Sequence, residues 1–215
     1  MSSKLFSQFE VNNNLNINLD RLKINDILRA ANLAKNAYIN EELSEYIFPD
    51  QSSRSQKLFE FFYFRLNTQR QFCSVTLPEI LALIISEPPG QHNENISILE
   101  IAYGFPMTVK IGIRSLSRLL KLQNYFVSIR KNLISEPFWY FDFIAVDPNH
   151  RRCKLGKMLI ENLLIQVDKN KAPVYLETQN PNYIKLYESF GFKIASQGKI
   201  PETNIPNFCM IRPIA

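Results

Sequence analysis

Residues 146–160, VDPNHRRCKLGKMLI, form the stretch on which the interpretation of this sequence depends. An aromatic and β-branched run ends at Val146, the first residue of the stretch. From Leu155 to Val167, apolar residues recur at every fourth position. The first pattern predicts a buried strand, and the second predicts the apolar face of a helix. The stretch therefore predicts a strand that turns directly into a helix.

Four cationic side chains gather at the start of this predicted helix: Arg151, Arg152, Lys154 and Lys157. The N–H groups of a first helical turn lack intrahelical partners, and the helix dipole makes that end positive. Cations are unfavourable there unless an anion compensates them, so we expect a phosphate or pyrophosphate ligand. A solvated basic surface is the alternative explanation. With one glycine, the turn matches neither the Walker A loop nor the dinucleotide-binding fingerprint.

Composition and length restrict the class of protein. The chain has 215 residues, of which 46% are hydrophobic and 21% are charged, as in soluble globular proteins. We expect a polar, Asn-rich N-terminal tail over residues 1–15 and a single domain over residues 16–215. The three cysteines are scattered and the two histidines are isolated, so we expect no disulfide framework and no metal site.

The charge and hydropathy of the chain suggest its surroundings. A net charge of +5 and a pI of about 9.1 suit an anionic ligand, but Lys and Arg do not cluster with aromatic residues, so no nucleic-acid partner is expected. No apolar run approaches the ~20 residues that span a bilayer, and the N-terminus lacks the apolar core of a signal peptide. We therefore expect no membrane partner and a cytoplasmic location.

The remaining patterns predict an α/β (α+β) fold built on one mixed sheet. We expect strands at 16–22, 138–146 and 174–178, a hairpin around Pro78 and Glu79, and an antiparallel strand pair at the C-terminal end. We expect helices at 25–39 and 52–67, one or two helices within 105–134, and a short helix at 183–190 that Gly191 ends in a left-handed cap.

The turn resembles motif A of the GNAT superfamily of acetyl-CoA-dependent N-acetyltransferases. The resemblance rests on Val146, Pro148, Arg151 and Gly156. It departs at Lys154, where the family usually has a glycine. Either a helical backbone at Lys154 still donates its N–H to the cofactor, with the ammonium adding to the attraction, or cofactor binding is weakened.

A second stretch, LETQNPNYIKLYESFGF at residues 176–192, resembles motif B of the same superfamily. The matching residues include Asn180, Tyr187 and Gly191, while Tyr183 replaces the usual alanine. The stretch is also similar to the puromycin-acetyltransferase-like branch. Together the two motifs imply a mixed, mostly antiparallel central sheet flanked by helices, in which two splayed strands hold acetyl-CoA.

The resemblance also implies a set of cofactor-binding residues. The backbone of the strand before the turn would hold the pantetheine arm, the turn would hold the pyrophosphate, and motif B would contact the pantetheine or the far side of the cofactor. The residues concerned are Ile144, Ala145, Val146, Arg151, Arg152, Cys153, Lys154, Leu155, Gly156, Lys157, Asn180 and Tyr183.

Two side chains are candidates for catalysis. In the family an amine attacks the thioester directly, and the resemblance implies that Tyr187 protonates the departing thiolate; a tyrosine of the core is the alternative. Asp142 is the only charge in an aromatic strand, which is costly unless it is paired or functional. By strand alternation it shares a face with Tyr140, Ile144 and Val146. A base, a substrate anchor and a structural ion pair all stay open for it.

Other titratable groups rank lower. Glu177 is the second candidate for a base, whereas His92 and His150 are not expected to act as bases. The implied partners are acetyl-CoA and a primary amine of a small molecule or peptide, with the chain acting as a monomer or homodimer. We expect the acceptor pocket to lie among residues 25–66, 88–104 and 105–134. A catalytically weak acyl-CoA-binding or sensor module is the alternative function.

Overall fold

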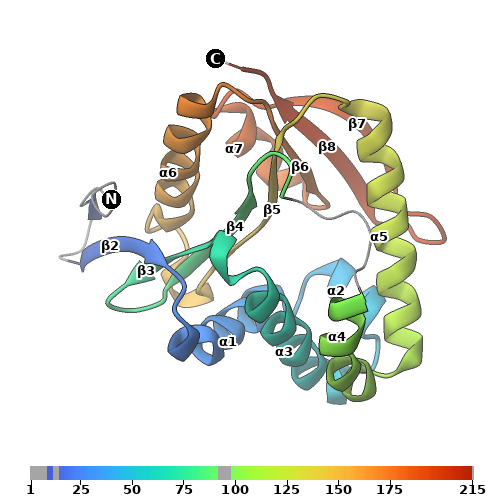
Figure 1. The fold of residues 1–215 in the computed structure, drawn as a ribbon. Helices are drawn as coiled ribbons and strands as arrows, with labels where there is room; N and C mark the ends of the chain where they lie inside the picture. The colour runs from blue at the N-terminus through green and yellow to red at the C-terminus, as the bar shows by residue number, and fades with distance from the viewer. Residues whose placement is uncertain (1–8, 12–14, 92–97, 215) are drawn as a thin grey trace.

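The computed structural model describes residues 9–11, 15–91 and 98–214 (Figure 1). Eight strands form one sheet in the order β1-β2-β3-β4-β5-β6-β8-β7. The strands are β1 (Phe9–Val11), β2 (Leu15–Arg21), β3 (Cys73–Leu77), β4 (Ala82–Glu87), β5 (Trp139–Val146), β6 (Val174–Thr178), β7 (Lys193–Lys199) and β8 (Pro206–Arg212). Every neighbouring pair is antiparallel except β5 and β6, which are parallel. The mixed, mostly antiparallel sheet is thereby confirmed.

The helices surround the middle of this sheet. They are α1 (Ile27–Tyr38), α2 (Glu42–Ile47), α3 (Gln51–Thr68), α4 (Ile98–Ile111), α5 (Ile113–Leu133), α6 (Leu155–Asn170) and α7 (Ile184–Glu188). Short 3-10 turns at Ile24–Asp26, Arg70–Phe72, Pro148–His150 and Pro181–Tyr183 join several elements. Figure 1 shows α6 and α5 on opposite sides of the central strands.

Each face of the sheet has its own apolar core. On one face the apolar side of α6, including Leu159 and Leu163, packs against Ile84 and Phe141. On the other face α1 and α3 cover β3 and β4, and α5 covers β6 and β8 through Ile129 and Leu133. The fourfold repeat that predicted α6 is therefore the repeat of residues buried against the sheet.

Most of the predicted elements are confirmed, but helix α2 and strand β1 were not anticipated. The region 105–134 forms α5 and part of α4, separated at Gly112, whose φ of +84° breaks the helix. The short helix α2 was not predicted. Strand β1 falls inside the stretch predicted as a tail, and residues 1–8 and 12–14 lie outside the described residues. In the part of the chain that the structure describes, no helix is long and apolar enough to cross a bilayer.

Candidate active site

The central strands β5 and β6 separate part of the way along their length. They pair only from Trp139–Val174 to Phe141–Leu176, although β5 continues to Val146. All six residues of β4 are buried, whereas Asp142, Phe143, Ile144 and Val146 of β5 are only partly buried. The separation therefore opens the edge of β5 that faces β6.

The backbone of β5 presents polar groups to this opening. The N–H of Asp147 donates to the carbonyl of Leu81 at 2.8 Å, so Asp147 faces β4. Because peptide groups alternate in direction along an antiparallel strand, Val146 and Ile144 direct theirs to the opposite, open side. The carbonyl of Ile144 accepts a hydrogen bond there from the hydroxyl of Tyr38 at 2.8 Å. Ala145, another predicted cofactor contact, is buried and pairs with Leu83 of β4 instead.

A β-bulge corrects the predicted orientation of Asp142. The register between β4 and β5 shifts so that Ile85 faces Phe143 while Ser86 faces Phe141, which leaves Asp142 as the extra residue. The extra residue puts Asp142 and Phe143 on the same face of the sheet. Ile144 and Val146 consequently pack on the α6 side, and the prediction that they share a face with Asp142 was wrong.

The turn before α6 uses two residues in the left-handed conformation. Arg152 has a φ of 68° and Lys154 has a φ of 63°, and Lys154 is the residue immediately before the helix. A helical backbone at Lys154 was therefore the wrong expectation. Glycine adopts this conformation without steric cost, which gives a physical reason for the glycine usual at this position. The first intrahelical bond runs from Met158 N–H to Lys154 O, so the N–H groups before it point out of the helix.

Of the four cationic side chains of the turn, two contact other residues and two are exposed to solvent. Arg152 and Lys154 are exposed, with no ion pair within the described residues. Lys157 lies 3.6 Å from Glu161, and Arg151 donates to the carbonyl of Ala37 at the end of α1 at 3.3 Å. Arg151 thus binds the end of α1, while the side chains of Arg152 and Lys154 face solvent.

Three further predicted residues of the turn, Cys153, Leu155 and Gly156, pack against the α6-side core or against β5. Leu155 is buried, and Cys153 is partly buried against the α6-side core. A Cβ on Gly156 would lie 3.5 Å from Val146 Cγ2 and 3.7 Å from Ile144 Cδ1. The glycine therefore permits close packing of the first turn of α6 on β5.

Tyr187 lies where motif B meets the sheet. Its ring is 7% exposed and makes edge-on contacts with Phe141 at 5.8 Å and Phe192 at 5.9 Å. Burial, together with the nearby phenol of Tyr183, raises the pKa of Tyr187 above the ordinary tyrosine value, so the phenol stays protonated well into the alkaline range. Tyr183 itself is 39% exposed. Asn180 caps the turn before α7, because its side chain accepts from the N–H of Asn182 at 3.1 Å.

Tyr38 is a site residue that the sequence did not reveal. Burial is the main cause that raises its pKa, followed by the phenol of Tyr187 and the charges of Glu41 and Asp142. These influences place the Tyr38 hydroxyl within electrostatic reach of both candidate catalytic residues. No sequence motif marks Tyr38, because only the tertiary fold brings α1 to the opening.

Both candidate bases are held by arginines. Asp142 accepts a hydrogen bond from Arg65 of α3, and the Arg65 guanidinium also lies 5.8 Å from the ring centroid of Phe143. Glu177 lies 3.6 Å from Arg130 of α5. Burial raises the pKa of Glu177 to about 7, against the opposing effects of Arg130 and the neighbouring tyrosine hydroxyls. Neither Arg65 nor Arg130 was singled out from the sequence.

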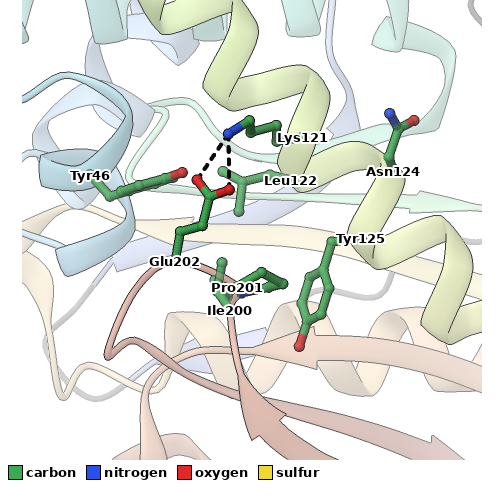
Figure 2. Close-up of a pocket in the computed structure, with 8 residues that line it drawn as sticks. All are labelled: Tyr46, Lys121, Leu122, Asn124, Tyr125, Ile200, Pro201 and Glu202. Carbon is green, nitrogen blue, oxygen red and sulfur yellow. Dashed lines mark hydrogen bonds and ion pairs between the residues drawn. The ribbon is translucent and has the colours of Figure 1, made fainter.

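A separate cavity of about 280 Å³ lies between α2, α5 and the β7–β8 hairpin (Figure 2). Figure 2 shows Lys121 of α5 bridging to the carboxylate of Glu202 at the hairpin tip, beside Tyr46 of α2. The cavity involves the helical insert that was expected to form the acceptor pocket. None of the candidate catalytic residues lines it.

Comparison with known proteins agrees with this geometry. Residues 123–194, which include β5, the turn, α6, β6 and α7, match the family described as Acetyltransferase (GNAT) domain. Solved structures match over nearly the whole chain, and the fold is the mixed α/β GNAT fold.

Three solved structures illustrate the likeness. A protein from Corynebacterium glutamicum, described as histone acetyltransferase HPA2 and related acetyltransferase, has a TM-score of 0.62 at 17% identity, covering 92% of this chain and 96% of its own. A mosquito arylalkylamine N-acetyltransferase-like protein has a TM-score of 0.57 at 16% identity, covering 91% and 98%. The C-terminal condensation domain of Ebony, solved with β-alanyl-dopamine, has a TM-score of 0.62 at 12% identity, covering 93% and 100%. At these identities the likeness concerns the fold.

Proposed function

We propose that this chain is an acetyl-CoA-dependent N-acetyltransferase in which a primary amine of a small molecule or peptide attacks the thioester directly. The observation that carries the proposal is the opening between β5 and β6, which ends beside the left-handed turn of α6 on one side and beside Tyr187 on the other. We assign the domain to residues 16–215.

The opening and the turn suit different parts of acetyl-CoA. The peptide groups of Ile144 and Val146 would pair with the amides of the pantetheine arm, as an added strand would. The free N–H groups at the start of α6, with Arg152 and Lys154, would hold the pyrophosphate. Because the Tyr38 hydroxyl bonds to the Ile144 carbonyl, that carbonyl exchanges its partner when the pantetheine arm binds. Asn180 and Tyr183 would contact the cofactor from the α7 side of the opening.

The chemical step needs one group to accept a proton and one to donate it. The attacking amine must lose a proton, and a carboxylate at the base of the opening, Asp142 or Glu177, would accept it directly or through water. The expelled thiolate would take a proton from Tyr187, whose phenol, like that of any tyrosine, is protonated at neutral pH. Glu177, with its pKa of about 7, is matched to accepting a proton at that pH.

The likeness of motif B to the puromycin-acetyltransferase-like branch fits a small-molecule acceptor. The mosquito neighbour is described as an arylalkylamine N-acetyltransferase-like protein, and the Ebony domain is bound to β-alanyl-dopamine. These neighbours support an amine acceptor as a class. They do not select one amine.

The test is isothermal titration of the protein with acetyl-CoA, comparing the wild type with Arg152→Glu and Lys171→Glu. Both residues are exposed cations with positive φ, but Lys171 follows the opposite end of α6. We expect micromolar binding that Arg152→Glu weakens at least about tenfold and Lys171→Glu leaves intact. Absence of binding by the wild type would overturn the proposal. Binding without CoA release against any amine would favour the acyl-CoA-binding module.

A further inference from the structure

The hydroxyl of Tyr38 lies at the open edge of β5, where two backbone groups of Ile144 face the opening. It donates a hydrogen bond to the Ile144 carbonyl at 2.8 Å, on the side of the strand that faces away from β4. In an extended residue the N–H and the carbonyl point to the same side, so the N–H of Ile144 also faces the opening. A side-chain donor and a backbone donor therefore lie next to each other at Ile144.

Contacts with three other elements hold Tyr38 in place. The centroid of its ring lies 5.4 Å from that of Phe62 on α3 and 6.1 Å from that of Phe143 on β5. Tyr38 is the last residue of α1, and the carbonyl of the preceding residue, Ala37, accepts a hydrogen bond from Arg151 of the turn. The ring is thus positioned before any ligand binds, as a group that stabilises a transition state should be.

The covalent structure of acetyl-CoA brings its thioester close to this hydroxyl. In the proposed binding mode, an amide N–H of the pantetheine arm donates to the Ile144 carbonyl, and only two methylene groups separate the last amide of that arm from the sulfur. The thioester then lies beside Ile144, within reach of Tyr38. The Tyr38 hydroxyl is also close enough to Tyr187 that this phenol is, after burial, the next cause of its raised pKa. Both phenols therefore border the space in which the thioester would lie.

We propose that Tyr38 is a further catalytic residue, whose hydroxyl, together with the N–H of Ile144, donates a hydrogen bond to the thioester oxygen of acetyl-CoA. The inference rests on the proposed N-acetyltransferase function. In the free protein the hydroxyl donates to the Ile144 carbonyl, and it turns to the thioester oxygen when the pantetheine arm takes that carbonyl. The two phenols then act on different atoms, Tyr38 at the oxygen and Tyr187 at the sulfur.

The reaction requires such donors because negative charge forms first on the oxygen. As the nitrogen of the amine bonds to the carbonyl carbon, an electron pair of the C=O double bond moves to the oxygen. Tyr38 and the Ile144 N–H stabilise this oxygen by hydrogen bonds and keep their own protons. When the double bond forms again, the C–S bond breaks, and the sulfur keeps its electron pair and takes the proton of Tyr187.

The first experiment titrates the wild type and Tyr38→Phe with CoA and with acetyl-CoA. The variant keeps the ring contacts with Phe62 and Phe143 and removes only the hydroxyl. Because the hydroxyl competes with the pantetheine arm for the Ile144 carbonyl, we expect CoA to bind the variant about threefold more tightly. Acetyl-CoA should gain less, because its thioester loses a hydrogen bond. Weaker binding of both ligands by the variant would mean that the hydroxyl only supports the strand, and would overturn the inference.

The second experiment observes the thioester carbonyl itself. Difference infrared spectra of the protein with acetyl-CoA, unlabelled and isotopically labelled at the carbonyl carbon, isolate the C=O stretch of the bound ligand. A hydrogen bond weakens the C=O bond, so the stretch should lie at lower wavenumber in the wild type than in Tyr38→Phe. Tyr125→Phe is the matched control, because the Tyr125 hydroxyl also donates to a backbone carbonyl, that of Lys199 at 3.1 Å, but Tyr125 lines the separate cavity. Its spectrum should equal that of the wild type.

Turnover completes the test and separates the inference from the function on which it rests. We expect kcat to fall about 100-fold in Tyr38→Phe, with no rise in KM for acetyl-CoA, and to stay unchanged in Tyr125→Phe. The same C=O stretch in the wild type and Tyr38→Phe, or the same kcat, would overturn the inference and leave the acetyltransferase standing. If the wild type binds acetyl-CoA but acetylates no amine, the infrared comparison alone decides the role of Tyr38. No binding of acetyl-CoA by the wild type would overturn the proposed function, and the inference with it.

Discussion

The two halves of the candidate site are built in different ways. The half that we propose binds the cofactor, the cofactor half, consists of β5, the turn and the start of α6, which are continuous in the sequence. The half that we propose binds the acceptor, the acceptor half, lies beneath α3 and α5 and combines Arg65, Glu87, Arg130 and Glu177 from four separate elements. The first half is made mainly of backbone geometry, whereas the second is made of side-chain charges.

This difference explains which half a short motif can reveal. A strand, a left-handed turn and a helix impose residue types at fixed spacing, so the pattern survives in the sequence as Val146, Pro148 and Gly156. An ion pair such as Arg65–Asp142 spans 77 positions and leaves no spacing rule. The predictions below test whether charge pairing governs the acceptor half while backbone geometry governs the cofactor half.

Among single substitutions, the largest effect on stability is expected from Arg65→Met. Methionine can still lie against the rings of Phe61 and Phe143, over which the guanidinium lies at 5.8 Å from each centroid. It leaves the Asp142 carboxylate, whose side chain is 9% exposed, without its cation. Removing one partner of a buried pair costs several kcal/mol, so we expect the free energy of unfolding to fall by about 3 kcal/mol. Urea denaturation measures the change.

The double variant Arg65→Met/Asp142→Asn sharpens this test. It should be more stable than Arg65→Met alone, because the unpaired charge is gone. Lys121→Met removes the exposed pair with Glu202 on the same side of the sheet and should leave the stability nearly unchanged. Strictly additive effects of the two substitutions at the Arg65–Asp142 pair would show that the pairing contributes nothing.

The next effect concerns catalysis in the opening. Tyr187→Phe keeps the edge-on contacts with Phe141 and Phe192 and removes only the hydroxyl. If the phenol protonates the thiolate, kcat should fall about 100-fold while the dissociation constant for acetyl-CoA stays the same. Steady-state assays with the amine that the protein acetylates most efficiently give kcat, and titration with acetyl-CoA gives the dissociation constant. Tyr63→Phe, a substitution on the exposed side of α3, is the control. An unchanged kcat would mean that Tyr187 has a purely structural role.

The acceptor half should also make stability depend on pH. Glu87 and Glu177 have pKa values of about 7 in the folded chain, raised from an ordinary value of 4.5. Between these values the folded chain binds more protons than the unfolded chain, so the free energy of unfolding falls as the pH rises through this range. Each group should contribute a loss of about 2.5 kcal/mol from pH 5 to pH 8, so we expect about 5 kcal/mol for the two together.

Glu87→Gln serves to identify the groups responsible for this pH dependence. The variant has no titrating carboxyl at that position, so its stability should fall less steeply between pH 5 and pH 8. Denaturation curves at matched ionic strength give both slopes. A wild-type protein that gains stability over this range would mean that the two carboxyl groups are ionised well below pH 7.

Sequence patterns predicted the sheet, the major helices and the turn because those features follow from periodicity and local backbone rules. They failed at Asp142 because a bulge inserts one residue into a strand, and simple alternation cannot detect it. They also missed Tyr38, whose hydroxyl reaches Ile144 across 106 positions. The left-handed φ of Lys154 was missed for a different reason: lysine rarely adopts it, so the residue type itself argued against the conformation.

The smallest effect distinguishes conformation from charge at the two ends of α6. Lys154 and Lys171 are both exposed, and both have a left-handed backbone, with φ of 63° and 49°. Glycine relieves the steric cost of that conformation but loses more entropy on folding, so Lys154→Gly and Lys171→Gly should each stabilise the chain by about 0.5 kcal/mol. Only Lys154→Gly should weaken acetyl-CoA binding, by about threefold at low salt and less at high salt, because only it removes a cation near the pyrophosphate. If Lys154→Gly instead tightened binding, the close approach of the backbone would matter more than the ammonium, and the cofactor half would be governed by geometry alone.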